Sequence, residues 1–312
     1  MTTANPFTDP TTVKALYLQP QRIEQRTRSL KAAKIRGPDA ATSIARLVVA
    51  ATTGARPTVI DLGCGRGSTT NALADALPAA RLIALDLSPG LLAVVRRRLA
   101  AIDTVCADLH ELPFAAGTAD VVVAAFCLYH SAQPRKVIAE IARCLGTAGR
   151  AILVTKSADS YVEIDQLISA SQLDPRATHR PSLYTTFNTS NAARITATVL
   201  RIERTLHQDH AFLFSDFECL AGYVSTSPKY QLPHHVTEHP AGLADELKRR
   251  LPEQPVLATS TVTYVVAAKP IRYRADLRQA LHRPGTMHCR PRTPHLARRP
   301  EVRRPAACIA FA

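Results

Sequence analysis

Residues 59–67 read Val-Ile-Asp-Leu-Gly-Cys-Gly-Arg-Gly, so three glycines at alternate positions directly follow a run of buried-strand character. A segment of helical character begins immediately after the last glycine. Glycine has no Cβ atom, so its backbone adopts positive φ readily and a ligand can approach it closely. The N–H groups at the beginning of the following helix favour an anionic group. This order of strand, glycine turn and helix predicts a ligand-binding turn in an α/β fold.

The same alternation of short apolar runs and helical stretches continues through residues 58–157. It is typical of a parallel sheet whose strands are joined by crossover helices. We therefore expect buried strands and amphipathic helices to follow one another along this segment. The expected strands are 58–62, 81–85, 104–107, 119–126 and 151–155, and the expected helices are 68–77, 89–101 and 134–145.

The segments on either side complete the expected organisation. Residues 1–38 are predicted to form an N-terminal helical arm or lid, with a polar helix over 12–35, and residues 39–269 to form the main domain. Within that domain, residues 158–258 contain a helical cap inserted before the last strand of a mostly parallel, seven-stranded sheet with helices on both faces. The remaining expected elements are helices at 39–53, 160–171, 189–200, 216–224 and 241–251 and strands at 201–214 and 259–268.

The net charge of +14 is concentrated near the C-terminal end of the sequence. Residues 270–312 contain ten Arg and only two acids, so they contribute eight of the fourteen net positive charges. The rest of the chain carries an ordinary surplus, which disfavours a nucleic-acid partner. Residues 270–312 are also rich in Pro and lack apolar periodicity, so we expect a disordered tail there.

Cysteine usage and the length of the apolar runs argue against several other classes. The seven cysteines are an odd number, form no Cys-x-x-Cys pair and have no His at metal-ligand spacing, so we expect neither disulfides nor a metal site. No window reaches the roughly 18 consecutive apolar residues of a membrane span. The first residues do not have the pattern of a secretory signal. We therefore expect a cytoplasmic protein with no membrane partner.

Three acids lie at the ends of successive predicted strands. Asp61 precedes the glycines, Asp86 ends the second strand, and Asp108 follows the third. Each acid alone would more often be a turn residue or a helix cap. An acid at the end of the second strand of such a sheet can accept hydrogen bonds from both ribose hydroxyls. Together the three positions predict a site for a nucleoside-containing ligand at the carboxyl ends of the strands.

The spacing of the glycines separates two kinds of nucleoside ligand. Dinucleotide-binding turns have the pattern G-x-G-x-x-G, whereas residues 61–67 here have the pattern Asp-x-Gly-x-Gly-x-Gly. This pattern resembles the first motif of class I S-adenosylmethionine-dependent methyltransferases. The segment Phe126-Cys-Leu-Tyr-His130 after the fourth strand resembles the corresponding part of the type 11 subfamily, which acts on small molecules. The resemblance covers residues 55–157 and the last strand, but neither 158–258 nor the tail.

The resemblance implies a Rossmann-like fold that binds S-adenosyl-L-methionine and releases S-adenosyl-L-homocysteine. It implies that Asp108 and the next backbone N–H address the adenine edge. In similar enzymes the N-terminal arm folds over the cofactor, so Tyr17, which lies near Arg22 and Arg26, either covers the methionine end or is an ordinary packing aromatic. The residues expected to contact the cofactor are Asp61, Gly63, Cys64, Gly65, Gly67, Asp86, Leu87, Asp108, Leu109, Phe126 and Tyr17.

His130 is the candidate general base because the end of the fourth strand faces the cleft. An unperturbed imidazole titrates at about pH 6.5, so it can exchange a proton near neutrality. The alternative is that His130 hydrogen-bonds to the backbone and shapes its loop, and the sequence leaves both roles open. Candidate contacts to the methyl acceptor are Tyr129, Tyr184, Phe187, Tyr223, Tyr230, His207 and His210.

The function favoured by these observations is methyl transfer to an O, N or C atom of a small molecule. Arg outnumbers Lys 31 to 8, which fits a GC-rich coding sequence. Such sequences are associated with bacterial secondary metabolism, including antibiotic biosynthesis. The sequence also leaves a homodimer open. The lack of an Asn/Asp-Pro-Pro-Tyr/Phe segment after the fourth strand disfavours a base-modifying nucleic-acid methyltransferase, and Cys127 lacks the Pro neighbour typical of RNA cytosine methylation. The glycine spacing disfavours an NAD-dependent oxidoreductase. An RNA methyltransferase and a non-catalytic, cofactor-binding regulatory protein remain the alternatives.

Overall fold

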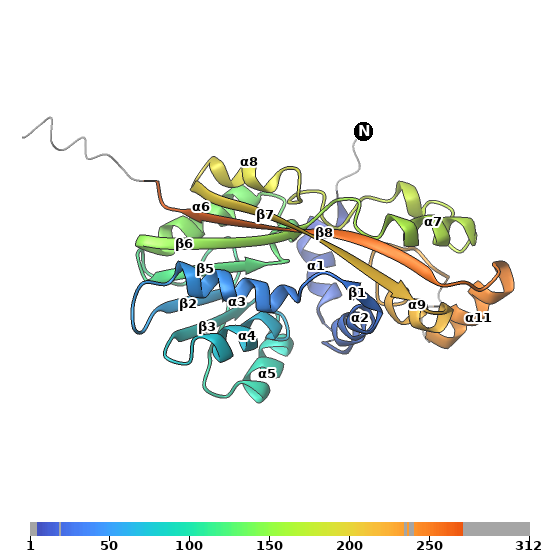
Figure 1. The fold of residues 1–312 in the computed structure, drawn as a ribbon, viewed down its shortest axis with the longest axis horizontal. Coiled ribbons are helices and arrows are strands. Elements are labelled where there is room, and N and C mark those ends of the chain that lie inside the picture. Colours follow the sequence, from blue (N-terminus) through green and yellow to red (C-terminus); the bar gives the residue numbers. More distant parts are fainter. Residues whose placement is uncertain (1–4, 19, 234–235, 237–239, 271–312) are drawn as a thin grey trace, which may run out of the picture. The chain divides into compact units, whose positions relative to one another are not determined.

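The computed structural model describes residues 5–18, 20–233, 236 and 240–270 (Figure 1). Nearly all of the segment predicted to be a disordered tail lies outside these residues. The described part of the chain folds around a sheet in which the strands follow the order β1-β7-β8-β6-β5-β2-β3-β4. The strands expected at 58–62, 81–85 and 104–107 are found close to their expected bounds, because their apolar runs are bounded by polar turns.

The central strands run parallel, as the sequence predicted. Strands β2, β3 and β5 are almost wholly buried, which is the usual environment of parallel strands covered by helices, whereas β4 lies at the edge of the sheet and is partly exposed. The bounds of these strands are β2 Thr58–Leu62, β3 Arg81–Asp86, β4 Asp103–Cys106, β5 Ala119–Ala125 and β6 Leu145–Lys156. The long strand β8 (Val256–Ala268) is antiparallel to β6 and to β7 (Arg201–Phe214), so the Rossmann-like order of the prediction is confirmed.

The sheet has eight described strands, and the predicted number of seven was wrong. The additional strand β1 (Lys34–Arg36) pairs antiparallel with the edge of β7. The sequence placed these residues at the end of the arm helix, and three residues are too few to show an alternating pattern. The helix ends at Ala33, and Gly37 adopts a φ of +93°, so the chain between them is extended beside β7. This pairing covers a strand edge that would otherwise present unpaired N–H and C=O groups.

Helices cover the two faces of the parallel strands. The residues of β5 show the division, because Val121 and Val123 pack in the cluster that includes α3 and α4, whereas Val122 and Ala124 pack in the cluster that includes α6 and α8. Figure 1 shows α3, α4 and α5 on one side of these strands and α6 and α8 on the other. The bounds are α3 Ala40–Ala51, α4 Ser68–Ala76, α5 Pro89–Arg98, α6 Pro134–Cys144 and α8 Ala192–Ala197.

Strands β7 and β8 continue beyond the end of β6 and carry a second core. Lys156, the last residue of β6, lies opposite Val262, whereas the β7–β8 ladder runs on to the pair Phe214 and Val256. Helices α7 (Val162–Ala170), α9 (Phe217–Val224) and α11 (Pro240–Arg250) pack on this extension with α2. We call this cluster the cap core; its buried residues include Phe212, Phe214, Phe217, Leu220, Leu243, Leu247 and Ala258.

The N-terminal arm contains two α-helices and a short 3-10 helix where the sequence predicted one helix. A short helix η1 (Pro6–Thr8) precedes α1 (Pro10–Leu16), and α2 (Pro20–Ala33) follows. Proline is suited to the first position of a helix because its φ is preset and its missing N–H would have no partner there. The prolines at residues 10 and 20 therefore begin two separate helices. Two further short helices are η2 (Leu128–His130) and η3 (Ala177–His179).

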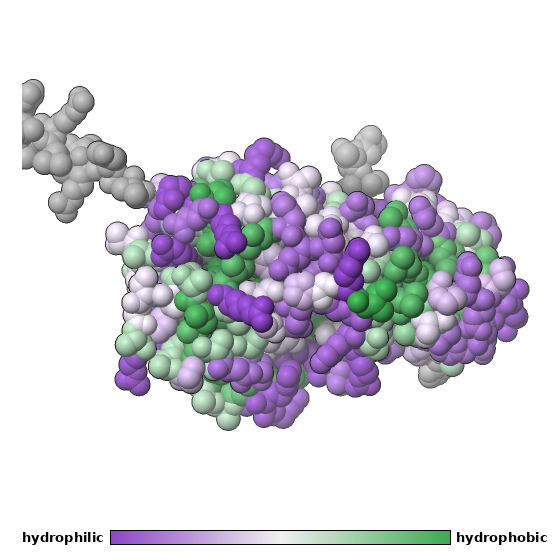
Figure 2. All heavy atoms as spheres, in the orientation of Figure 1, coloured by the Kyte–Doolittle hydropathy of each residue, from purple (hydrophilic) through white to green (hydrophobic). Residues whose placement is uncertain are grey.

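The surface of the described unit is mostly polar on the face drawn in Figure 2, with apolar residues gathered in a few areas. The exposed large apolar side chains include Ile35, Leu213 and Leu257. None of the described helices combines the length and the apolar character that a membrane span requires.

Phe214 tests whether the β7–β8 extension carries a true core. Its side chain is fully buried, whereas that of its neighbour Leu213 is 40% exposed. Phe214→Ala should lower the free energy of unfolding by about 3–5 kcal/mol, since it removes a buried ring and leaves a cavity. Leu213→Ala is the matched control and should cost only about 0.5 kcal/mol. Urea denaturation followed by circular dichroism measures both, and equal losses for the two variants would contradict a packed cap core.

Candidate active site

The glycine turn between β2 and α4 lies at the carboxyl ends of the parallel strands. Gly63 has a φ of +63°, and a Cβ atom there would lie 2.6 Å from the Cβ of Cys127. Gly65 has a φ of +56°, and a Cβ atom there would meet nothing within 4 Å, because this residue faces the cavity. The N–H of Cys64 donates to the carbonyl of Leu85 at 3.0 Å and so fixes the turn to β3. The turn thus presents bare backbone to a ligand.

Asp86 lies directly beside this turn, as predicted. Its Oδ2 accepts the N–H of Gly65 at 2.9 Å, and its Oδ1 accepts the N–H of Ser88 at 2.9 Å. Burial raises the pKa of Asp86, although the two N–H groups oppose the shift. A carboxylate oxygen accepts about two hydrogen bonds, so each oxygen can still receive a ribose hydroxyl. Leu87 lies next to it and also lines the cavity.

Asp61 differs from Asp86 because its side chain is occupied within the protein. Asp61 is only 2% exposed, and the hydroxyl of Thr70 on α4 donates to its Oδ2 at 2.6 Å. Burial raises the pKa of Asp61 to about 7, although the hydrogen bond from Thr70 opposes the shift. This hydrogen bond joins the end of β2 to the helix after the glycine turn. Asp61 therefore contributes to the shape of the turn.

Asp108 is held by a residue that the sequence did not single out. His110 donates its backbone N–H to Asp108 Oδ1 at 2.8 Å, and its Nδ1 lies 2.7 Å from the same oxygen. The other ring nitrogen lies 2.8 Å from the hydroxyl of Ser131, so His110 links the loop after β4 to the loop after β5. Burial alone would raise the pKa of Asp108, but the hydrogen bonds from His110 lower it below its usual value. Asp108, Leu109 and His110 line the cavity together.

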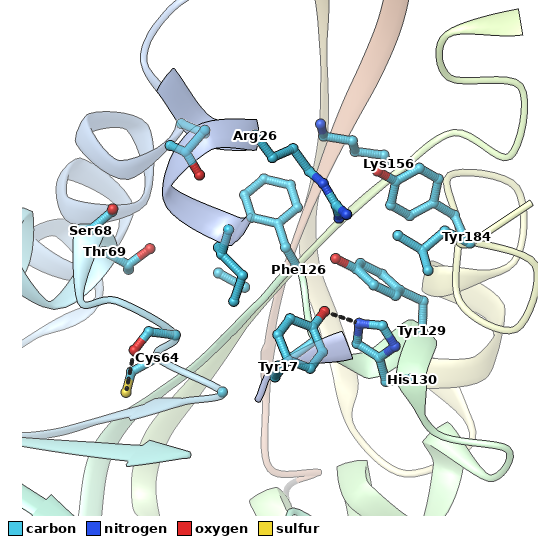
Figure 3. A pocket seen from close by; sticks show the side chains of 18 of the residues that line it. Tyr17, Arg26, Cys64, Ser68, Thr69, Phe126, Tyr129, His130, Lys156 and Tyr184 are labelled. Carbon is cyan, nitrogen blue, oxygen red and sulfur yellow. Dashed lines mark hydrogen bonds between the residues drawn. The ribbon is translucent and has the colours of Figure 1, made fainter. Parts of the chain in front are cut away.

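Phe126 ends β5 one residue earlier than expected because its φ is +57°. Non-glycine residues occupy this left-handed region only when the surroundings require it, and such residues cluster at functional sites. The Phe126 N–H donates to the carbonyl of Val154 at 2.9 Å, which keeps the backbone attached to β6. The ring enters the cavity, where the ammonium of Lys156 lies 5.7 Å from its centroid (Figure 3).

His130 contacts the N-terminal arm through both ring nitrogens. Nδ1 lies 3.1 Å from the carbonyl oxygen of Phe7, so it carries the proton and donates. Nε2 lies 2.5 Å from the Tyr17 hydroxyl, which therefore donates to it (Figure 3). Burial lowers the pKa of His130 to about 4, so the imidazole is neutral near pH 7. The backbone contact that the sequence left open as an alternative is thus present, and the catalytic role of His130 stays a prediction.

Tyr17 lies at the point where the arm meets the strand ends. Its carbonyl accepts the hydroxyl of Ser88 at 3.3 Å, and burial raises the pKa of its own hydroxyl. A second tie lies farther along the arm, where Glu24 forms an ion pair with Arg66 of the glycine turn at 2.8 Å. The arm therefore covers the turn and contacts the loops after β3 and β5.

These side chains surround one cavity of about 1160 Å³. Pockets for a single drug-sized ligand typically measure roughly 300–1,000 Å³, so this cavity has room for a cofactor and a second molecule. Every residue predicted to contact the cofactor lines it except Gly67. Gly67 is instead the N-cap of α4 with a φ of +79°, and a Cβ atom there would lie 3.1 Å from Val95.

The predicted acceptor contacts divide into two groups. Tyr129, Tyr184, Tyr223, Tyr230 and His210 line the cavity. Phe187 does not, because it is fully buried in the cluster with α6 and α8, and His207 does not, because its Nδ1 bonds to Thr263 on β8.

The cavity also contains residues that the sequence did not identify. Lys156 follows the predicted fifth strand directly, so the rule that ligands bind at strand ends could have found it. Tyr161 and Asp165 belong to the chain after that strand and had no such signal. The contact between Tyr17 and His130 joins residues 113 positions apart and depends on how the arm folds back.

Comparison with known proteins agrees with this geometry. Residues 60–153 match the sequence family described as "Methyltransferase domain". A malonyl-[acyl-carrier protein] O-methyltransferase from Hahella chejuensis is 36% identical over 113 residues, which cover 35% of this chain and 39% of that protein. A demethylmenaquinone methyltransferase from Clavibacter sepedonicus is 38% identical over 98 residues, which cover 30% of this chain and 39% of that protein. The chain thus spans about two fifths of the length of these relatives.

The fold has a counterpart among solved structures. A protein of Bacillus halodurans C-125 assigned as a methyltransferase superposes with a TM-score of 0.51 and 18% identity, covering 73% of this chain and 99% of the other. This likeness shows that the chain has the Rossmann-like fold of class I methyltransferases. The similarity to the type 11 methyltransferase domain lies in residues 60–153.

The lowered pKa of His130 predicts how the free energy of unfolding depends on pH. An unfolded His takes up a proton near pH 6.5, whereas folded His130 resists protonation down to about pH 4. Between these values the unfolded state binds more protons, so this group reduces stability as the pH falls. His130→Asn should therefore show a shallower loss of stability between pH 6.5 and 4, by up to about 1.4 kcal/mol per pH unit. Urea denaturation at several pH values measures the slopes; parallel slopes for both proteins would refute the burial of a neutral imidazole.

Proposed function

We propose that this protein transfers the methyl group of S-adenosyl-L-methionine to an O, N or C atom of a small molecule. The observation that carries the proposal is the placement of Asp86, which lies against the bare backbone of Gly65 and has free acceptor positions on both oxygens. When bound, the cofactor supplies an electrophilic methyl group on a sulfonium. The residues that would hold it are those of the glycine turn, Asp86, and the loop containing Asp108 and Leu109.

A small acceptor is supported by the walls of the cavity. Aromatic rings line the part beyond the glycine turn: Tyr129 from the loop after β5, Tyr184 from the segment between η3 and α8, and Tyr223 from the cap core. Residues of the arm also line it. Rings on several sides suit a compact molecule, and methyl transfer depends mainly on holding the acceptor in line with the reacting bond. The small-molecule relatives named above favour the same class.

His130 is the proposed base for an acceptor that still carries its proton. Its Nε2 is occupied by the Tyr17 hydroxyl, so the acceptor proton would pass to the Tyr17 oxygen as the Tyr17 proton passes to Nε2. This relay keeps Tyr17 neutral, which its raised pKa requires. A pKa of about 4 makes the imidazole a weak base, so positioning contributes more to the rate than proton removal does.

The cellular setting inferred from the sequence is part of the same proposal. It comprises a cytoplasmic location, a role in secondary metabolism such as antibiotic biosynthesis, and a homodimer. We also propose that residues 1–38 form a lid and that residues 39–269 form the methyltransferase domain. Residues 158–258 of that domain would contribute acceptor-side elements, and residues 270–312 would be a separate tail.

Binding of S-adenosyl-L-homocysteine tests the proposal directly. Calorimetry should show binding to the wild-type protein. Asp86→Ala should weaken the affinity on the order of 100-fold, since hydrogen bonds to a charged group are worth about 1.5–3 kcal/mol each. Asp103→Ala, which changes an exposed acid on β4, is the matched control and should bind normally. No heat of binding to the wild-type protein would rule out the proposed function.

A further inference from the structure

The part of the cavity beyond the glycine turn has walls of paired aromatic rings. Tyr129 and Tyr184 pack edge to face with centroids 4.9 Å apart, and Tyr161 and Tyr223 pack with centroids 5.4 Å apart. Paired rings restrain one another and present flat apolar surface to a ligand. Burial raises the pKa of all four hydroxyls, so these residues are neutral hydrogen-bonding groups. A planar molecule would fit between such walls.

Lys156 brings a positive charge into this space from the end of β6. Its Nζ donates to the Tyr161 hydroxyl at 2.5 Å and lies 4.8 Å from the centroid of the same ring. An ammonium has three N–H donors. Among the described residues, no carboxylate lies within ion-pair distance of Lys156, so two donors are left for a ligand.

Arg26 brings a second positive charge from α2 of the arm. Its Nη2 donates to the carbonyl of Thr226, which holds the guanidinium against the end of α9. Within the described ranges Arg26 also has no carboxylate partner. Figure 3 shows Arg26 and Lys156 reaching into the cavity near Tyr184, and both charges lower the pKa of the Tyr184 hydroxyl against the effect of burial. The two cations thus share one neighbour.

Three of the acids that line the cavity are engaged elsewhere. Asp165 pairs with Lys229 and accepts the Tyr230 hydroxyl at 2.8 Å. Asp61 is bonded to Thr70, and Asp86 lies at the proposed ribose position. Half-buried cations without a counter-ion are unfavourable unless a ligand supplies the opposite charge. The cavity is therefore suited to an anion.

Resting on the proposed function, we propose that the methyl acceptor is a small aromatic molecule with an anionic group. Arg26 and Lys156 bind the anionic group, and Tyr129, Tyr161 and Tyr184 enclose the ring. A guanidinium matches a carboxylate or phosphate with two parallel hydrogen bonds, and an ammonium adds a point charge. The acidic group thereby fixes the end of the molecule that lies away from the glycine turn.

Three probes of similar size test the charge requirement on the protein saturated with S-adenosyl-L-homocysteine. They are 4-hydroxybenzoate, phenyl phosphate and uncharged 4-hydroxybenzamide, each titrated by ligand-observed NMR. At least one anion should bind 10-fold or more tightly than the amide, and the better of the two identifies carboxylate or phosphate as the preferred group. Amide binding equal to or tighter than both anions would overturn the proposal.

Variants assign the preference to the two cations. Lys156→Gln and Arg26→Gln should each weaken the preferred anion about 10-fold and leave the amide unchanged. Arg28→Gln is the control, because Arg28 lies on the same helix with a side chain that is 75% exposed. Thermal denaturation and calorimetry with S-adenosyl-L-homocysteine are the controls that test whether each variant is folded.

The calorimetry also distinguishes a failure of the proposed anion site from a failure of the proposed function. A 10-fold loss of S-adenosyl-L-homocysteine affinity in either variant would mean that the cation binds the cofactor, which overturns the anion site alone. Equal losses for the acid and the amide would do the same. Absence of S-adenosyl-L-homocysteine binding by the wild-type protein would instead refute the proposed function.

Discussion

The backbone pairing of β7 with β8 is the interaction on which the part of the cavity beyond the glycine turn depends. Where β6 ends at Lys156, the two long strands continue to Phe214 and Val256 and provide the surface on which α7, α9 and α11 pack. The parallel strands alone would form only the glycine turn and the acid positions. Because the cap core stands on the same ladder, the rings of Tyr161 and Tyr223 are held at a defined place beside the strand ends.

Burial gives this site its chemical character, since it favours the neutral form of most groups inside. It raises the pKa of Asp61 to about 7, lowers that of His130 to about 4, and raises those of the buried tyrosines. Among the described residues, neither Arg26 nor Lys156 has an acid partner in these surroundings. The contrast between neutral walls and two cations is what makes the charge of a ligand decisive.

The sequence predicted the elements that depend on local pattern, and it missed those that depend on tertiary contacts. The strands at Thr58–Leu62 and Arg201–Phe214 have the predicted bounds, the first because its apolar run ends at the polar glycine turn. The prediction of seven strands failed at Lys34–Arg36, a segment too short to show a period. The ties of His130 to Phe7 and Tyr17 have no sequence signal, because they exist only after the arm has folded across the strand ends.

The strand β1 has a consequence for how the arm can move. Lys34–Arg36 is the direct continuation of α2 and is hydrogen-bonded along the edge of β7. At Gly37 a side chain would collide with His210, 2.7 Å from where its Cβ would stand, so the chain leaves the strand along a fixed path. The base of the arm is therefore part of the sheet. In the lid movement that we propose for the arm, the chain would pivot on the N-terminal side of Lys34, and the far end, with Phe7 and Tyr17, would travel the greatest distance.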